Sequence, residues 1–155
     1  MLQPIPTLYR GAQFRSRAEA RWAVLFDGIG LEWEYEKEGF QLPTQWYLPD
    51  FWFGQLSAFG EVKAATEQWD EAALLKAREL AAESRRAVLL LSDVSCMEPL
   101  VPALCPCGVE IDQHNVDLRQ SLERGRIWAD DDLTADLMEW WASPAERARH
   151  YRFYR

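Results

Sequence analysis

The chain has 155 residues, of which 48% are hydrophobic, and a formal net charge of -8 at pH 7. This length and apolar content suffice for a buried core, and a single domain over residues 1–155 is the simplest expectation. The negative charge argues against a general nucleic-acid coat protein, because phosphate binding needs a local excess of cations.

No apolar run reaches the roughly 18 residues that a membrane-spanning helix needs, and no basic-then-apolar leader opens the sequence. We therefore expect a soluble protein of the cytoplasm with no membrane partner. Three cysteines, an odd number, predict reduced thiols or metal ligands and no disulfide framework.

Basic residues gather at the two ends of the chain. Residues 1–30 contain four arginines and two acids, and residues 143–155 contain four arginines and one acid, which leaves a strongly acidic middle. Such ends are compatible with an arginine-lined phosphate groove and equally with solvated helix faces. The candidate phosphate contacts are Arg15, Arg17, Arg21 and Arg152.

The first predicted helix begins at Ser16, after an extended lead-in over residues 1–7. Glu19 stands three residues after Ser16, which is the spacing of a capping box, and apolar residues recur at helical intervals until Gly28 or Gly30. Glu19 also lies near the edge of the buried stripe. Two roles for this acid stay open at this point, a helix cap and an acid that faces a functional site.

The stretch from Tyr47 to Lys63 carries two aromatic runs of strand length around a short break. Side chains alternate along a strand, so Glu61 and Lys63 project to the same face, and a hairpin of the two runs can place Asp50 beside Glu61. Burying such charges is costly unless they are paired or bound to metal. Two carboxylates and an ammonium at one sheet edge suit Mg²⁺ or Mn²⁺.

The elements around this stretch follow ordinary patterns. Residues 31–36 alternate as a half-exposed strand does, and residues 39–44 predict a turn. A helix is predicted over residues 67–84, and the apolar run 87–91 predicts a strand that is covered on both faces. Strands separated by such a helix predict a mixed sheet with a crossover connection.

Pro49-Asp50 followed by Glu61-x-Lys63, with Glu19 on a preceding helix, resembles the PD-(D/E)XK nuclease superfamily, which has the restriction endonuclease-like fold. The resemblance covers residues 14–92 and extends to small phage and bacterial nuclease-like proteins. It implies an α/β fold with a mixed sheet flanked by helices, in the order α-β-β-β-α-β. It also implies a metal-dependent nuclease that hydrolyses phosphodiester bonds, with DNA as the favoured substrate, in the cytoplasm of a bacterial cell.

The resemblance gives each site residue a role. Asp50, Glu61, Glu19 and the carbonyl of Val62 would hold one or two Mg²⁺ or Mn²⁺ ions. Lys63 would orient the attacking water or stabilise the phosphate oxyanion. Similar superfamily members often have glycine after this lysine, where the chain has Ala64, and alanine is strained there if the backbone needs a positive φ.

A rival hypothesis is a nuclease-fold protein without turnover, which acts as a binding or inhibitory partner of another protein or of nucleic acid. Eight tryptophans could form a contact surface as well as a core. Restriction and junction-resolving members of the superfamily often act as dimers, so a homodimer stays open. No competing catalytic set is visible, because the two histidines, His114 and His150, lack evident partners.

Residues 95–114 contain three prolines and predict an irregular insert. Cys105-Pro106-Cys107-Gly108 resembles a zinc knuckle, and the four candidate zinc ligands are Cys96, Cys105, Cys107 and His114. The Cys-x-Cys spacing is shorter than in most zinc sites, so packing of reduced thiols is favoured over a structural Zn²⁺. A zinc-stabilised adaptor is the third functional hypothesis.

The remainder, residues 115–155, predicts a helical region with helices over 115–124, 133–141 and 144–154. Pro144 falls just inside the start of the last helix, where proline is tolerated. The final residues mix arginine with aromatic rings, which suits stacking on bases. We favour the alternative that these rings pack on the core.

Overall fold

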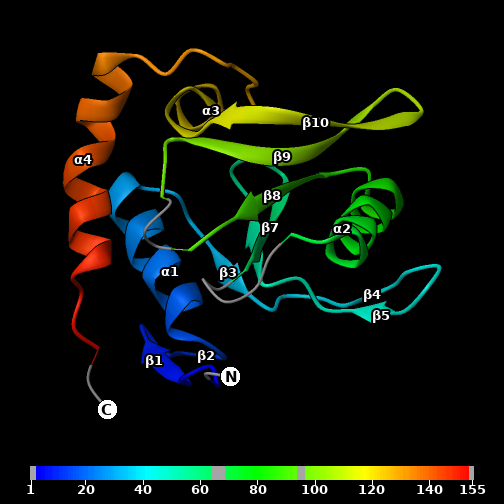
Figure 1. Cartoon of the computed structure of the whole chain (residues 1–155), viewed down its shortest axis with the longest axis horizontal. Helices are drawn as coiled ribbons and strands as arrows, with labels where there is room; N and C mark the ends of the chain where they lie inside the picture. The colour runs from blue at the N-terminus through cyan, green and yellow to red at the C-terminus, as the bar shows by residue number, and fades with distance from the viewer. Residues whose placement is uncertain (1–2, 64–68, 94–96, 154–155) are drawn as a thin grey trace.

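The computed structural model describes residues 3–63, 69–93 and 97–153, and shows a mixed α/β protein (Figure 1). Its six-stranded sheet consists of β3 (Glu34–Tyr35), β6 (Phe51–Phe53), β7 (Ala58–Val62), β8 (Ala87–Leu91), β9 (Leu100–Cys107) and β10 (Glu110–Asp117). The spatial order is β10-β9-β8-β7-β6-β3. The described helices are α1 (Arg17–Ile29), α2 (Glu71–Ser84), α3 (Leu118–Arg124) and α4 (Ala135–Arg149). The α/β class predicted from the sequence is confirmed.

The centre of the sheet follows the sequence pattern closely. Strands β6 and β7 form the predicted antiparallel hairpin, in which Phe51 lies opposite Gly60. Strand β8 runs parallel to β7, and α2 makes the crossover between them. This confirms the mixed sheet. The half-exposed strand predicted over residues 31–36 is reduced to β3.

Helix α2 begins later than predicted. Residues 67 and 68 lie outside the described part of the chain, whereas Trp69 and Asp70 are described and non-helical. Asp70 is the N-cap, and its carboxylate accepts a hydrogen bond of 2.8 Å from the backbone N–H of Ala73. Aspartate at this position satisfies a backbone donor that a helix start leaves unpaired, so the helix begins after it.

The helices cover both faces of the sheet. Helices α1 and α4 lie side by side on one face, and α2 lies on the other (Figure 1). Helix α1 has the predicted capping box at Ser16 and ends at Gly30, whose φ of 79° is a left-handed conformation that suits glycine. Gly28 lets α4 approach closely, because a Cβ there would lie 3.2 Å from that of Pro144.

The prediction of an irregular insert over residues 95–114 is wrong. Of these residues, 100–107 form β9 and 110–114 belong to β10, and the two strands pair over eight residues each. Proline within a strand removes a hydrogen-bond donor, which is tolerated at sheet edges. Within the described residues, β8 pairs with β9 at Leu104 and Ala103 alone, so Pro102 and Pro106 lie where β9 has a partner strand on one side.

The helical region predicted over residues 115–155 is only partly correct. Residues 115–117 complete β10, and the helix that follows is the short α3. The two helices predicted over 133–141 and 144–154 are one continuous helix, α4, with Pro144 inside it. The apolar stripe of Leu137, Trp141, Ala145 and Ala148 is buried on both sides of the proline, and this burial offsets the lost backbone hydrogen bond.

Two small hairpins complete the structure. Strands β1 (Thr7–Tyr9) and β2 (Ala12–Phe14) pair before α1, directly after the extended lead-in predicted over residues 1–7, and this hairpin was not predicted. Strands β4 (Phe40–Gln41) and β5 (Trp46–Tyr47) form the second hairpin, so part of the turn predicted over residues 39–44 is a strand and the turn itself lies between residues 41 and 46. None of the described helices is long and apolar enough to cross a membrane.

Gly60 in the middle of β7 provides a test of this packing. A Cβ at this position would lie 2.7 Å from Cε2 of the fully buried Phe53 and 3.2 Å from Cδ1 of Leu91. Gly60→Ala should therefore lower the free energy of unfolding by about 1–3 kcal/mol, measured by urea denaturation.

Gly54→Ala is the matched control, since a Cβ there meets nothing closer than Nε1 of Trp52 at 3.6 Å. Equal urea midpoints for the two variants would contradict the packing around Gly60.

Candidate functional site

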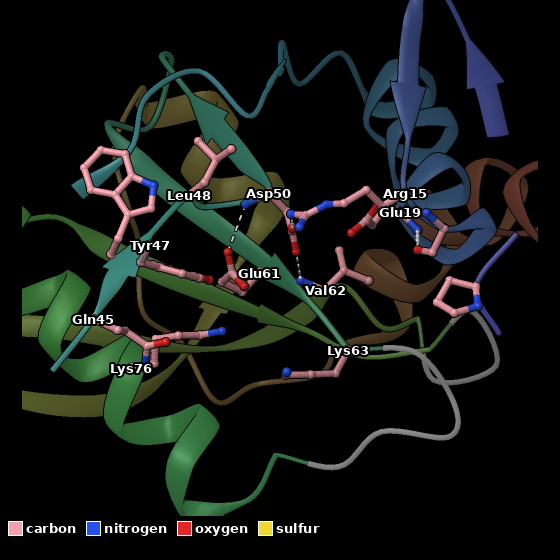
Figure 2. Close-up of a pocket in the computed structure, with 13 residues that line it drawn as sticks. Arg15, Glu19, Gln45, Tyr47, Leu48, Asp50, Glu61, Val62, Lys63 and Lys76 are labelled. Carbon is pink, nitrogen blue, oxygen red and sulfur yellow. Dashed lines mark hydrogen bonds and ion pairs between the residues drawn. The ribbon is translucent and has the colours of Figure 1, made fainter. Parts of the chain in front are cut away.

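A cavity of about 520 Å³ opens between the start of β6, the end of β7, α1 and α2 (Figure 2). Its lining includes all five residues predicted for catalysis or for binding Mg²⁺ or Mn²⁺, which are Glu19, Asp50, Glu61, Val62 and Lys63. Arg15, Tyr47 and Lys76 also line it. Helix α1, the β6–β7 hairpin and α2 each contribute charged side chains to this one cavity.

Asp50 and Glu61 are held together by reciprocal hydrogen bonds. The backbone N–H of Asp50 donates to Oε1 of Glu61, and the backbone N–H of Val62 donates to Oδ2 of Asp50, each at 2.9 Å. The hairpin register explains this arrangement, because Asp50 immediately precedes Phe51, which lies opposite Gly60. Figure 2 shows the two carboxylates side by side in the middle of the cavity.

Three acids of the cavity are buried. Only 7% of Glu19, 5% of Asp50 and 6% of Glu61 is exposed to solvent. Burial raises the pKa of Glu61 from 4.5 to about 7, although the charges of Lys76 and Lys63 oppose the shift. Burial also raises the pKa of Asp50, and the negative charge of Glu19 raises it further. A bound cation would favour the ionised form of both acids.

Glu19 performs the capping role and also faces the cavity. Its Oε2 accepts hydrogen bonds from the backbone N–H of Ser16 at 3.1 Å and from the hydroxyl of Tyr35 at 2.9 Å. Among the described residues, however, Glu19, Asp50 and Glu61 do not bring one oxygen each within 4.8 Å of one another. The structure thus brings Asp50 and Glu61 together. Glu19 lies close to Asp50, but the three carboxylates do not converge on one point.

Arg15 supplies a positive charge inside the cavity. Its Nη2 lies 3.2 Å from Oδ1 of Asp50, and its Nε lies 2.7 Å from Oε1 of Glu36. The guanidinium thus contacts one buried acid of the pair while much of its side chain is exposed, at 61%. This residue was predicted to contact phosphate, and it lies at the edge of the cavity where a phosphate could reach it.

Two lysines face the cavity from different elements. Lys63 follows β7, where its backbone N–H donates to the carbonyl of Leu91 at 2.9 Å, and its Nζ lies 5.8 Å from the ring centroid of Trp69. Lys76 comes from α2, and its Nζ lies 4.4 Å from the ring centroid of Tyr47. Both ammonium groups are near enough to Glu61 to favour its charged form.

Sequence reasoning missed Lys76 and Tyr35 as site residues. Lys76 interrupts the buried stripe of α2 between Ala73 and Leu80, and a charge on such a stripe was the available signal. Tyr35 shows no comparable signal, because it alternates with acids as any half-buried strand residue would.

The other predicted phosphate contacts are not among the described residues that line this cavity. Arg21 donates from Nη1 to the carbonyls of Ala148, Arg149 and Tyr151, at 3.1, 2.9 and 3.2 Å, and so joins α1 to the end of α4. Arg17 is half-buried, and Arg152 is exposed beyond α4.

The neighbouring rings of the C-terminal segment pack as expected. The ring centroids of Tyr151 and Phe153 lie 5.4 and 6.1 Å from that of Tyr9. This part of the chain therefore contacts the core through its aromatic side chains.

The residues of the predicted zinc knuckle are separated from the cavity. Cys105 and Cys107 lie on β9 and His114 lies on β10, whereas Cys96 falls outside the described residues. Ala64, the departure from the superfamily pattern, also falls outside them.

Comparisons with protein-family models, with curated proteins and with solved structures found no match. A proposal for the function therefore has to rest on the chemistry of the cavity. Carboxylate oxygens are hard donors, and each carboxylate has acceptor capacity beyond its one backbone hydrogen bond. Arg15, Lys63 and Lys76 add the local positive charge that an anionic substrate requires.

The raised pKa of Glu61 predicts how stability depends on pH. Between about pH 4.5 and 7 the folded protein retains a proton that the unfolded chain has lost, so stability falls as pH rises. Urea denaturation in the absence of divalent cations should show this fall, and Glu61→Gln should remove about 3 kcal/mol of it. The same pH dependence in both proteins would show that the fold does not raise this pKa.

Proposed function

We propose that the protein is a metal-dependent nuclease that hydrolyses phosphodiester bonds, with DNA as its substrate. The observation that carries this proposal is the reciprocally bonded pair of buried acids, Asp50 and Glu61, with the Lys63 side chain one strand step further along. Buried acids of this kind are costly without a counter-charge, and a divalent cation supplies one.

The order of the elements supports a restriction endonuclease-like core. Apart from the separate β4–β5 hairpin, which is inserted between β3 and β6, helix α1 is followed by β3, β6, β7, α2 and β8, which is the order α-β-β-β-α-β. The last strand runs parallel to the third strand of this series. Strands β9 and β10 extend the sheet beyond β8, and α3 and α4 follow them.

The donor set of the cavity fits Mg²⁺ or Mn²⁺. Asp50 and Glu61, with the carbonyl of Val62, would hold one ion, and Glu19 would act through a water ligand or a second ion because it lies off the common point. Mg²⁺ keeps several waters in protein sites, which suits a cavity that is open to solvent. When bound, the cation stabilises charge on the phosphate and lowers the pKa of water.

The side chains of the cavity complete the proposed reaction. The oxygen of a water molecule attacks phosphorus and gives up one proton to solvent, while the bond from phosphorus to the leaving oxygen breaks and that oxygen takes up a proton from solvent. Lys63 holds the attacking water or the phosphate oxygen, and Arg15 binds a neighbouring phosphate oxygen at the cavity edge. The basic side chains around the cavity also make phosphate binding compatible with the negative net charge of the chain, because a phosphate group responds to the local electrostatic field.

Cleavage assays with single-stranded, duplex and branched DNA test this proposal. With Mg²⁺ or Mn²⁺ we expect cleavage that is abolished by a chelator. Asp50→Asn, Glu61→Gln and Lys63→Met should each lower the initial rate by about a hundredfold or more, because each removes a group that stabilises the transition state.

Exposed residues provide matched controls for these variants. Glu83→Gln and Lys37→Met change the same residue types outside the cavity and should leave the rate unchanged. Full activity in Asp50→Asn would refute the mechanism. A well-folded protein that cleaves none of the substrates but binds DNA or a protein would favour the nuclease-fold binding protein.

Metal binding can be measured separately from cleavage. If Asp50 and Glu61 hold the ion, Mg²⁺ should stabilise the folded protein by about 2.7 kcal/mol when its free concentration is a hundred times its dissociation constant. Asp50→Asn and Glu61→Gln should lose most of this increment in urea denaturation, whereas Glu83→Gln should keep it. A Mg²⁺ increment that is equal in all four proteins would place the ion elsewhere.

A further inference from the structure

One face of the β9–β10 hairpin carries a second group of metal-ligating side chains. Asp112 and His114 are two residues apart on β10 and so project to the same face. In the strand register Asp112 lies opposite Cys105, so the alternate residue Cys107 projects to that face as well. One ligand atom from each of Cys107, Asp112 and His114 lies within 4.8 Å of the others.

The contact between the thiol and the imidazole is the most informative distance. Sγ of Cys107 lies 3.4 Å from Nε2 of His114. A sulfur ligand and a nitrogen ligand of one tetrahedral zinc ion, at bond lengths of about 2.3 and 2.0 Å, are separated by about 3.5 Å. The two atoms therefore already stand at the separation that a shared ion requires.

We propose that Cys107, Asp112 and His114 bind one Zn²⁺ ion, with water in the fourth position. Thiolate and imidazole are ligands that select zinc and related transition metals over Mg²⁺ and Ca²⁺. All three side chains are exposed, so the site is open and does not require a closed shell of four protein ligands.

This ligand set differs from the one predicted from the sequence. Asp112 replaces Cys96, and Cys105 is excluded because its half-buried side chain packs against the hydrophobic core. The sequence predicted four soft ligands at the spacing of a zinc knuckle. The strand register instead joins one residue of β9 to two of β10 across the turn at Gly108 and Val109.

The position of the site gives it a structural role. Strand β8 pairs with β9 only at Leu104 and Ala103, so the tip of the hairpin extends beyond the neighbouring strand. Val109 at the turn is 94% exposed, and the tip therefore gains little from apolar burial. An ion that joins the two strands would restrain this end of the hairpin.

Co²⁺ binding to the full, reduced and metal-free protein tests the proposal. Cobalt ligated by thiolate gives a charge-transfer absorption band in the near ultraviolet, whereas the described residues that line the carboxylate cavity include no cysteine and would give none. We expect the intensity of this band to increase until one equivalent of Co²⁺ has been added. The band should disappear when Zn²⁺ displaces the cobalt.

Variants of the hairpin identify the ligands. Cys107→Ser should abolish the band, and Asp112→Asn and His114→Gln should weaken Zn²⁺ binding by about tenfold or more in a competition titration. Cys105→Ser is the matched control and should keep both the band and the affinity. Because the three proposed ligands are exposed, their variants should retain the far-ultraviolet circular dichroism of the native protein.

Three results would overturn the proposal. The first is no charge-transfer band in the native protein, which would make the contact between Cys107 and His114 a simple hydrogen bond. The second is a band that survives Cys107→Ser. The third is a band that Cys105→Ser removes, since the ion would then lie deeper in the hairpin.

Discussion

The pair of hydrogen bonds between Asp50 and the end of β7 is the constraint on which the cavity depends. Each acid accepts a backbone N–H from the other strand of the hairpin, so neither carboxylate can rotate away without leaving a buried donor unpaired. The bonds also oppose the effect of burial, since an N–H donor lowers the pKa of the carboxylate that accepts it. The positions of the two acids are therefore fixed by the sheet.

The surrounding layers hold this pair in place and add charge to it. Behind the hairpin, Phe51 and Phe53 are fully buried, and the ring of Phe26 from α1 packs edge-on against both, with centroids 5.2 and 4.9 Å apart. On the open side, the N-terminus of α1 brings Arg15 and Glu19, and α2 brings Lys76. The capping box that starts α1 thus also fixes an acid at the cavity. The capping-box pattern therefore both starts the helix and positions a carboxylate at the cavity.

The sequence predicted the parts of the structure that depend on local periodicity. Alternation in the stretch before Lys63 was enough to pair β6 with β7 and to place Asp50 beside Glu61.

The prediction from the sequence failed over residues 95–114, because proline was taken to end a strand. In the described structure of β9, the positions of Pro102 and Pro106 lack a second neighbouring strand, so proline is tolerated there. The prediction failed again at Pro144, where the buried stripe of α4 outweighs the proline. In both cases tertiary contacts that local sequence does not contain decided the outcome. Tyr35 was missed for the same reason, since only the assembled fold brings it to Glu19, whereas Lys76 left a signal in the charge that interrupts the buried stripe of α2.

Donor chemistry separates the two sites proposed for this chain. The cavity offers carboxylates backed by Arg15 and two lysines, a set that suits hard cations and phosphate, and no cysteine or histidine is among its described lining residues. The β9–β10 hairpin offers a thiol, an imidazole and one carboxylate, a set that suits zinc.

The two sites should also fill independently. Mg²⁺ binds poorly to sulfur and nitrogen ligands, so it should not compete for the β9–β10 hairpin at concentrations that fill the cavity. Zinc at the hairpin would in turn leave the raised pKa values of Asp50 and Glu61 unchanged, because those arise from burial within the cavity. Stability, absorption and cleavage measurements thus report on two independent sets of residues.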